Sequence, residues 1–317
     1  MPSAGTPEER LLAALGWNVH AGPPSPELIR AAAQIAPRLD RAGARVVLAS
    51  DPAYPPGLRD LSDPPPALFV RGALPVRSRA VAIVGARAAT PYGRARAGEL
   101  ARDLVRAGCT IVSGLAQGID AAAHQGALEE EGSSVAVLPG GLDAITPPTH
   151  EPLAQALCAR GGLVSERASG APGFKGAFVR RNRLIAALSA VTVVVEAAER
   201  SGALSTAARA RRLGRPVLAV PGDVDRPTSR GTHRLLREGA ALCENAADVM
   251  AALGPPEALS DPAERLIAAL AAAPRSAEVL AATAGLGLDD TLARLLSLEW
   301  SGIAAREPGP RWRRGGA

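Results

Sequence analysis

The sequence is poor in cysteine, lysine and aromatic residues. Its 317 residues include three Cys, three Phe, three Trp and two Tyr, and Lys175 is the only lysine. The cysteines lie far apart and follow no metal-ligand spacing, so we expect neither a disulfide nor a metal site. No apolar run approaches the ~20 residues of a membrane span, and the first ten residues carry acids where a signal peptide needs bases. We expect a cytoplasmic globular protein with no membrane segment.

The motifs of common nucleotide-dependent enzymes are also missing. The turn after the first long apolar run reads Gly85-Ala-Arg-Ala-Ala-Thr90 instead of Gly-x-Gly-x-x-Gly, and the next run ends in Ser113 rather than an acid. There is no phosphate-binding loop ending in Gly-Lys-Ser/Thr, no nucleophile elbow and no paired-carboxylate spacing. Glu196 is a candidate acid/base, and an ion-pair partner is the other reading. We therefore expect no catalytic residue and no cofactor.

Arginine is abundant, and its distribution is uneven. The whole chain has a net charge of +5. Residues 99–159 contain eight acids and two arginines, a net −6, whereas residues 160–240 contain fifteen bases and six acids, a net +9. Positive charge gathered in one part of a chain favours a partner rich in phosphate.

Short apolar runs alternate with helical patterns between residues 80 and 253. The expected strands are 80–84, 110–113, 134–138, 163–165, 191–196 and 216–220. The expected helices are 91–107, 119–131, 149–160, 181–189, 203–213 and 232–238. This alternation predicts an α/β fold with a doubly wound, mostly parallel sheet covered by helices on both faces. Such sheets bind ligands outside the carboxyl ends of their strands.

Glycine and small polar residues follow five of the expected strands. The turns are Gly85-Ala-Arg87, Ser113-Gly114-Leu-Ala-Gln117-Gly118, Pro139-Gly140-Gly141, Ser201-Gly202 and Pro221-Gly222. Glycine lets backbone N–H groups approach an anion without a clashing Cβ atom. Tight turns need glycine for structural reasons as well, but several such turns on one rim favour a phosphate-bearing ligand.

Donor-rich side chains are concentrated in the segment Phe178-Val-Arg-Arg-Asn-Arg183. We expect a helix to begin here, so that its free N–H groups and positive end act together with the guanidinium groups on phosphate. Phe174 and Phe178 offer rings on which a base could stack. The alternative is a solvated basic face with a phenylalanine in the core.

Two smaller units flank the sheet region. Residues 1–45 contain two helical patches and form a reduced N-terminal helical segment. The central domain covers residues 46–253, and a proline-containing linker covers 254–261. Residues 262–317 contain three amphipathic helices and a tail with a Pro-Gly turn, a pattern that predicts a winged helix. The third helix opens with Asp289-Asp290, which repels phosphate, so a protein contact is favoured over DNA reading for this unit.

Several motifs, in this order, resemble the DNA-processing protein A family (DprA, also called Smf). They are Gly85-Ala-Arg, Ser113-Gly-Leu-Ala-Gln-Gly-Ile-Asp-Ala-Ala-Ala-His124, Leu138-Pro-Gly-Gly-Leu-Asp143, Phe178-Val-Arg-Arg-Asn-Arg-Leu-Ile-Ala187, Ser201-Gly-Ala-Leu-Ser-Thr-Ala207, Ala219-Val-Pro-Gly222 and Gly231-Thr-His-Arg-Leu-Leu-Arg-Glu-Gly-Ala240. The resemblance covers about residues 46–253.

The resemblance implies an extended Rossmann-like domain that binds single-stranded DNA, forms a homodimer and loads the RecA recombinase during natural transformation. The DNA-binding residues that we expect on this basis are Gly85, Arg87, Ser113, Gly114, Gln117, Gly118, Lys175, Phe178, Arg180, Arg181, Asn182, Arg183, Ser201 and Gly202.

Two other functions have partial support in the sequence. A nucleotide phosphoribohydrolase of the lysine-decarboxylase-like family shares the Pro-Gly-Gly turn, but the chain has Pro139-Gly-Gly-Leu-Asp-Ala-Ile145 where those enzymes place a catalytic glutamate. A regulator of double-stranded DNA would use the winged helix. Competition between single and double strands distinguishes this regulator from a single-strand binder.

Overall fold

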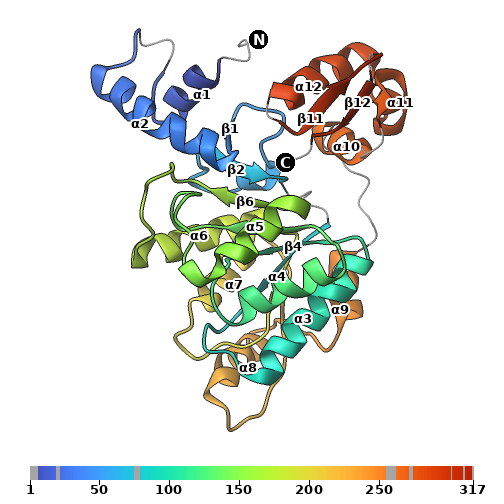
Figure 1. The fold of residues 1–317 in the computed structure, drawn as a ribbon. Coiled ribbons are helices and arrows are strands. Elements are labelled where there is room, and N and C mark those ends of the chain that lie inside the picture. The colour runs from blue at the N-terminus through green and yellow to red at the C-terminus, as the bar shows by residue number, and fades with distance from the viewer. Residues whose placement is uncertain are drawn as a thin grey trace.

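The fold is built around one large sheet (Figure 1). The computed structural model describes residues 6–18, 22–74, 79–254, 262–270, 274–300, 302–309 and 311–315. Within these residues, nine strands form the sheet in the order β1-β2-β6-β5-β4-β3-β7-β8-β9. The strands are β1 Arg45–Leu48, β2 Ala67–Gly72, β3 Ala80–Val84, β4 Thr110–Ser113, β5 Ser134–Val137, β6 Gly162–Ser165, β7 Val191–Val194, β8 Val217–Ala219 and β9 Ala241–Leu242.

The predicted parallel sheet is confirmed. All six strands expected between residues 80 and 220 are present and pair in parallel, with ends within two residues of those expected. Within this sheet only β2 runs against the other strands, and it pairs antiparallel with β1 on one side and with β6 on the other. The sequence analysis missed β9, because this strand has two exposed residues and no apolar run.

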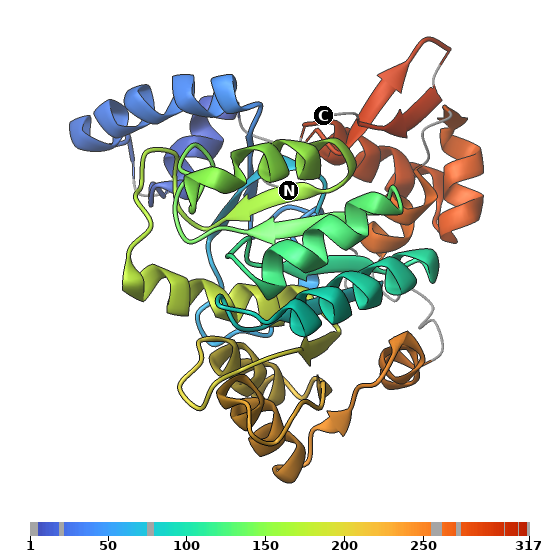
Figure 2. The ribbon, with the colours of Figure 1, turned by 60° about the horizontal axis from the view of Figure 1, so that its bottom comes forward.

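Helices cover both faces of the sheet, as the alternation predicts. They are α3 Pro91–Arg106, α4 Ile119–Glu129, α5 Glu151–Arg160, α6 Lys175–Leu188, α7 Ala203–Arg212, α8 Arg230–Arg237 and α9 Ala246–Leu253. Side chains on β3 alternate between the faces: Ala82 and Val84 pack with α6 and α7, whereas Val81 and Ile83 pack with α3 and α4. Figure 2 shows α3 and α4 lying side by side across their face.

The strand order reverses beside β3, and this reversal creates the natural ligand position of the fold. The strand β4, next in the chain, pairs with one side of β3, and β7 pairs with the other side. The turns that follow β3 and β7 must therefore leave the sheet in opposite directions and open a crevice between them.

The N-terminal helices α1 Pro7–Ala14 and α2 Pro26–Ala42 pack on the β1–β2 end of the sheet (Figure 1). Leu11 and Leu39 share a core with Val46 and Phe69. Capping residues fix both helix starts: Thr6 forms a capping box with Glu9, and Ser25 caps α2. These helices are therefore part of the same folded body as the sheet.

The C-terminal unit is a winged helix. Its elements are α10 Pro262–Ala269, β10 Arg275–Ser276, α11 Ala277–Ala284, α12 Leu288–Trp300, β11 Ala304–Glu307 and β12 Arg311–Arg314. The three strands pair in the order β10-β12-β11. Most of the linker expected at 254–261 lies outside the described residues. Among the helices that are described, none combines the length and apolar content needed to cross a bilayer.

Candidate functional site

A pocket of about 580 Å³ lies in the crevice beside β3. Its walls come from four segments that are far apart in the sequence: the turns after β3, β4 and β7, and the first three turns of α6. It brings together many of the expected residues, namely Gly85, Arg87, Lys175, Phe178, Arg181, Asn182, Ser201 and Gly202. These candidates from the sequence therefore lie together in one pocket.

The expected start of α6 was wrong. The helix begins at Lys175, with Phe174 as its N-cap, so residues 180–183 lie in its second and third turns. The N–H groups of Ala177 and Phe178 already donate to the Phe174 carbonyl oxygen. The free N–H groups at the positive end of the helix dipole therefore belong to residues 174–176. Gly176 in the first turn weakens the helical pattern there, which explains why the sequence suggested a later start.

Arg181 forms the floor of the pocket. Its side chain is buried, and Nη1 donates hydrogen bonds to the Val137 carbonyl oxygen and, at 2.7 Å, to the Gly114 carbonyl oxygen. These carbonyl groups follow β4 and end β5, so one guanidinium joins two strand ends. Burial lowers the pKa of Arg181 to about 10, and Asp120 opposes this change.

Asp120 supplies the counter-charge beneath the pocket. It is buried in the first turn of α4, and its carboxylate accepts a hydrogen bond from the Ala116 N–H at 3.4 Å. Burial raises the pKa of Asp120, while the positive charge of Arg181 lowers it. The sequence analysis did not select this residue, because a single acid near a helix start is usually a capping group.

Arg183 faces the protein interior instead of the pocket. Only 2% of its side chain is exposed, and it forms ion pairs with Glu166 and, at 3.3 Å, with Asp63. Successive helical residues point about 100° apart. Arg180 and Arg183 are therefore only about 60° apart and both contact Glu166, whereas Arg181 turns towards the pocket. The expectation that all three present free donors to phosphate does not match these positions.

The accessible cations are at the mouth of the pocket. The Arg87 guanidinium lies over the Phe178 ring at 4.6 Å from its centroid, and Lys175 is exposed beside them. Arg180 has 66% of its side chain exposed and lies 3.4 Å from Glu166. It lines a shallow hollow with Lys175 and Arg209, and this hollow shares Lys175 and Val179 with the pocket. The sequence analysis missed Arg209, which reaches this surface only because α7 packs against α6.

Asn182 connects α6 to the turn after β7. Its Nδ2 donates to the Gly202 carbonyl oxygen at 3.1 Å and to Ser205 Oγ at 2.9 Å. Ser201 and Gly202 are thereby held at the rim. Both hydrogen bonds come from the Asn182 amide nitrogen, so this side chain positions the turn after β7.

The Ser113–Gly118 turn lies below and beside the pocket. Ser113 is buried, and its hydroxyl donates to the Ile83 carbonyl oxygen at 2.6 Å. Gly118 has φ +82°, and a Cβ atom there would lie within van der Waals overlap of the Ala86 carbonyl oxygen. Gly114 lies against the Arg181 guanidinium, and Gln117 is exposed. The glycines in this turn thus allow close packing of protein on protein.

Both enzymatic features noted in the sequence make structural contacts within the protein. Glu196 is buried and accepts hydrogen bonds from the Thr90 N–H at 2.9 Å and hydroxyl at 2.5 Å. The Pro-Gly-Gly turn is covered by the 171–173 loop, because a Cβ atom at Gly140 would lie 2.9 Å from the Ala171 carbonyl oxygen. Within the described residues, no group of three His, Cys, Asp or Glu could hold a metal ion.

The chain is a doubly wound α/β protein with a winged helix in its C-terminal part. Its pocket contains cationic side chains and a phenylalanine ring, and it lies where the strand order reverses. The family model of DNA recombination-mediator protein A matches residues 45–254, and that of the DprA winged helix domain matches residues 245–310. The chain belongs to the DNA recombination-mediator protein A family.

Relatives and solved structures agree with this membership. Protein Smf of Escherichia coli is 37% identical over 290 residues, which cover 86% of this chain and 78% of that protein. A Mycobacterium tuberculosis relative is 48% identical over 179 residues, and this match covers 56% of this chain but only 46% of that protein's length.

Two solved structures have a similar fold. The X-ray structure of DNA processing protein A from Streptococcus pneumoniae has a TM-score of 0.63 and 32% identity, covering 78% of this chain and 93% of that one. The Helicobacter pylori protein, described by its single-stranded DNA binding mode, has a TM-score of 0.59 and 32% identity, covering 65% of this chain and 93% of that one.

Proposed function

We propose that this protein is a single-stranded DNA-binding recombination mediator. The observation that carries the proposal is the pairing of Arg87 with the Phe178 ring at the mouth of a cationic pocket, beside exposed Lys175. Proteins that bind single strands combine cations, which neutralise the phosphate backbone, with aromatic rings on which bases stack. Such stacking does not depend on the sequence, because every base has a face that can stack. The single-stranded DNA binding mode of the Helicobacter pylori relative supports the same reading.

The pocket residues divide into two roles in this proposal. Arg87, Lys175 and Arg180 contact phosphates, and Phe178 stacks on a base. The N–H groups of Gly85 and Gly202 and the hydroxyl group of Ser201 approach the backbone of the strand. Other residues position these groups from below, namely the buried Ser113, Gly114, Arg181, Asn182 and Arg183 and the half-buried Gly118. Exposed Gln117 lies at the edge of the bound strand.

We extend the proposal to the biology of the family. The protein acts in the cytoplasm as a homodimer, protects incoming DNA and loads the RecA recombinase during natural transformation. Family membership supports this role. The working units are residues 1–45, 46–253 and 262–317 with a linker at 254–261, and none of them is an enzyme. The contacts of Glu196 with Thr90 and the covered Pro-Gly-Gly turn support the absence of catalysis.

The winged helix does not read DNA in this proposal. Its third helix, α12, exposes a row of apolar side chains at four-residue spacing, Leu288, Leu292, Leu296 and Trp300. Asp289 and Asp290 are in its first turn, and Arg294 pairs with Asp290 at 2.9 Å. A groove-reading helix needs free basic or amide side chains. A double-stranded competitor should therefore displace a bound single strand poorly.

The proposal is tested by single substitutions Arg87→Gln, Lys175→Gln and Arg180→Gln, measured by fluorescence anisotropy with an oligo(dT) strand at several salt concentrations. Each should weaken binding about fivefold and make the slope of log K against log salt shallower by about 0.7, because one phosphate contact is lost. Phe178→Ala should weaken binding with little change in slope, since stacking releases no counterions.

Arg106→Gln is the matched control. Arg106 is an exposed cation at the carboxyl end of α3, which is the opposite edge of the sheet from the pocket. It should leave both the affinity and the slope unchanged. Equal losses in Arg106→Gln and in the pocket variants would mean that binding depends on overall charge, and the proposed site would be wrong.

A further inference from the structure

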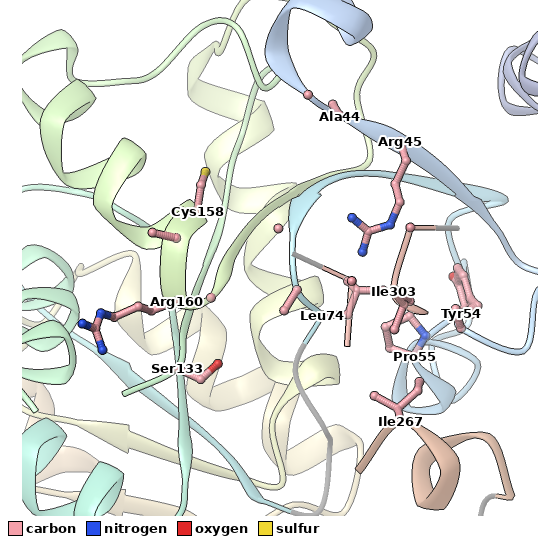
Figure 3. Close-up of a pocket in the computed structure, with 18 of the residues that line it drawn as sticks. Ala44, Arg45, Tyr54, Pro55, Leu74, Ser133, Cys158, Arg160, Ile267 and Ile303 are labelled. Carbon is pink, nitrogen blue, oxygen red and sulfur yellow. The ribbon is translucent and has the colours of Figure 1, made fainter. Parts of the chain in front are cut away.

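A second cavity, of about 450 Å³, lies at the junction of the winged helix and the β1–β2 end of the sheet (Figure 3). Its walls come from the start of β1, the 52–56 loop, the end of β2, the carboxyl end of α5 and the winged unit, which contributes Ile267 and Ile303 among others. The described residues show no overlap between this lining and that of the DNA pocket. The volume is in the range of small-molecule sites.

Arg45 is the polar group directed into this cavity. Figure 3 shows its guanidinium reaching into the space between Leu74, Ile303 and Tyr54. The Arg45 Nε atom is buried and has no hydrogen-bond partner among the described residues. Arg45 is the first residue of the edge strand β1, and its aliphatic stem packs against the winged unit, where a Cβ atom at Gly302 would lie 3.3 Å from Arg45 Cδ.

No carboxylate of the described residues pairs with this guanidinium. The described residues that line the cavity include no Asp or Glu. The other charged lining residue is Arg160, whose Nη2 pairs with Glu131 Oε1 at 3.0 Å and whose side chain points away from the cavity (Figure 3). Burial alone lowers the pKa of Arg45 to about 10, with no acidic neighbour to oppose it. Arg45 is half-buried, and its Nε atom has no partner among the described residues. A guanidinium that is partly removed from water is stabilised by an opposite charge, so this cavity suits a ligand that brings its own negative charge.

The apolar residues that line the rest of the cavity indicate the chemical nature of the uncharged part of that ligand. Tyr54, Pro55, Leu74, Ile267 and Ile303 form an apolar wall around the guanidinium. The planar fork of arginine matches the two oxygens of a carboxylate or a phosphate. We propose that this cavity binds a small organic oxyanion, a carboxylate or phosphate monoester with an apolar group, whose charged end pairs with Arg45 and whose body bridges the sheet and the winged helix.

The test uses the full-length protein and four probes in isothermal titration: benzoate, phenyl phosphate, inorganic phosphate and phenol. Benzoate or phenyl phosphate should bind saturably at concentrations up to about 10 mM, and inorganic phosphate and phenol should bind at least about tenfold more weakly, because each lacks one half of the contact. The comparison of benzoate with phenyl phosphate identifies the preferred charged group. Saturating oligo(dT) should not displace the bound anion.

Arg45→Met is the decisive variant, and Arg30→Met, at an exposed arginine of α2, is its control. Arg45→Met should abolish anion binding and leave the unliganded protein at least as stable to urea as the wild type, whereas Arg30→Met should bind normally. If Arg45→Met does not fold, Arg45→Lys serves instead, with affinity expected to fall about tenfold as the fork is lost.

Three results would overturn the proposal. The first is the absence of saturable binding of either organic anion to the wild type. The second is unchanged binding in Arg45→Met or Arg45→Lys. The third is displacement of the anion by oligo(dT), which would place it in the DNA pocket. Because the two cavities share no residue, failure here leaves the proposed DNA site untouched, and failure of that site leaves this one untouched.

Discussion

Two of the three arginines in segment 180–183 are buried, and burial changes what a guanidinium can do. Arg181 donates hydrogen bonds to the carbonyl oxygens of Gly114 and Val137, and Arg183 forms ion pairs with Glu166 and Asp63. The sequence identified a basic cluster next to a phenylalanine at the carboxyl edge of the sheet. It could not say which members face solvent, because that depends on the start of α6 and on partners in other parts of the chain, such as Gly114 and Asp63.

Buried His124 gives a prediction about pH. Its Nδ1 lies 2.7 Å from Ser134 Oγ, which itself donates to the Ile111 carbonyl oxygen, and its Nε2 has no partner among the described residues. Burial, with the nearby charges of Arg181 and His150, lowers the pKa of His124 from 6.5 to about 3. As the pH falls from 6.5 towards 3, His124 binds a proton in the unfolded chain but not in the folded chain. The free energy of unfolding therefore decreases across this pH range.

His124→Gln should remove that loss. Between about pH 7 and pH 5, the free energy of unfolding of the wild type should fall by about 2 kcal/mol more than that of the variant. Urea unfolding followed by circular dichroism at both pH values measures the difference. Equal falls in the two proteins would show that His124 can be protonated in the folded state.

At the scale of elements, the sequence predicted regular structure well where local pattern decides it. The strands between residues 80 and 220 are buried apolar runs, and α3 starts at Thr90-Pro91, a side-chain cap followed by proline. The start of α6 was missed because Phe174 makes no side-chain cap and Gly176 is in the first turn. The short edge strands β9 and β10 have two residues each and exist only through pairing.

Thr90 connects the start of α3 to the residues that follow β7 through hydrogen bonds, which the sequence pattern did not reveal. Its hydroxyl accepts a hydrogen bond from the Gly93 N–H at 3.0 Å and donates one to Glu196, which follows β7. Thr90→Val removes the cap of α3 and one donor to a buried carboxylate. It should reduce the free energy of unfolding by about 2–3 kcal/mol.

Thr90→Ser keeps the hydroxyl and is the matched control, with an expected loss below about 1 kcal/mol. Chemical unfolding of the three proteins provides the measurement. Thr90→Val keeps the methyl group and loses the hydroxyl, whereas Thr90→Ser does the reverse. A loss in Thr90→Val no larger than that in Thr90→Ser would show that the two hydrogen bonds contribute little.

At the scale of the whole molecule, the described residues of the winged helix do not line the proposed DNA pocket, but they share a hydrophobic core with the sheet. The pocket is lined only by residues between 84 and 206. The core that contains Val47 and Tyr54 continues into the winged unit through Ile303 and Trp312. Removal of residues 255–317 should therefore leave the affinity for oligo(dT) within about threefold, while apolar surface near β1 becomes exposed and the melting temperature falls.

Anisotropy and thermal unfolding of the truncated chain measure the two effects. A folded truncated protein that has lost most of its affinity would show that the winged unit takes part in holding the strand. An unchanged melting temperature would show that the shared core contributes little to stability.

The carbonyl oxygens at the end of a parallel sheet point towards whatever binds there, and their partial negative charge repels an incoming polyanion. Arg181 lies against two of them, at Gly114 and Val137, and cancels this local field from inside the protein. A nucleic acid approaching the rim then meets the attraction of the outer cations without opposition from the backbone beneath them. If a strand binds at this rim as proposed, Arg181 thus favours it from beneath by compensating the backbone dipoles.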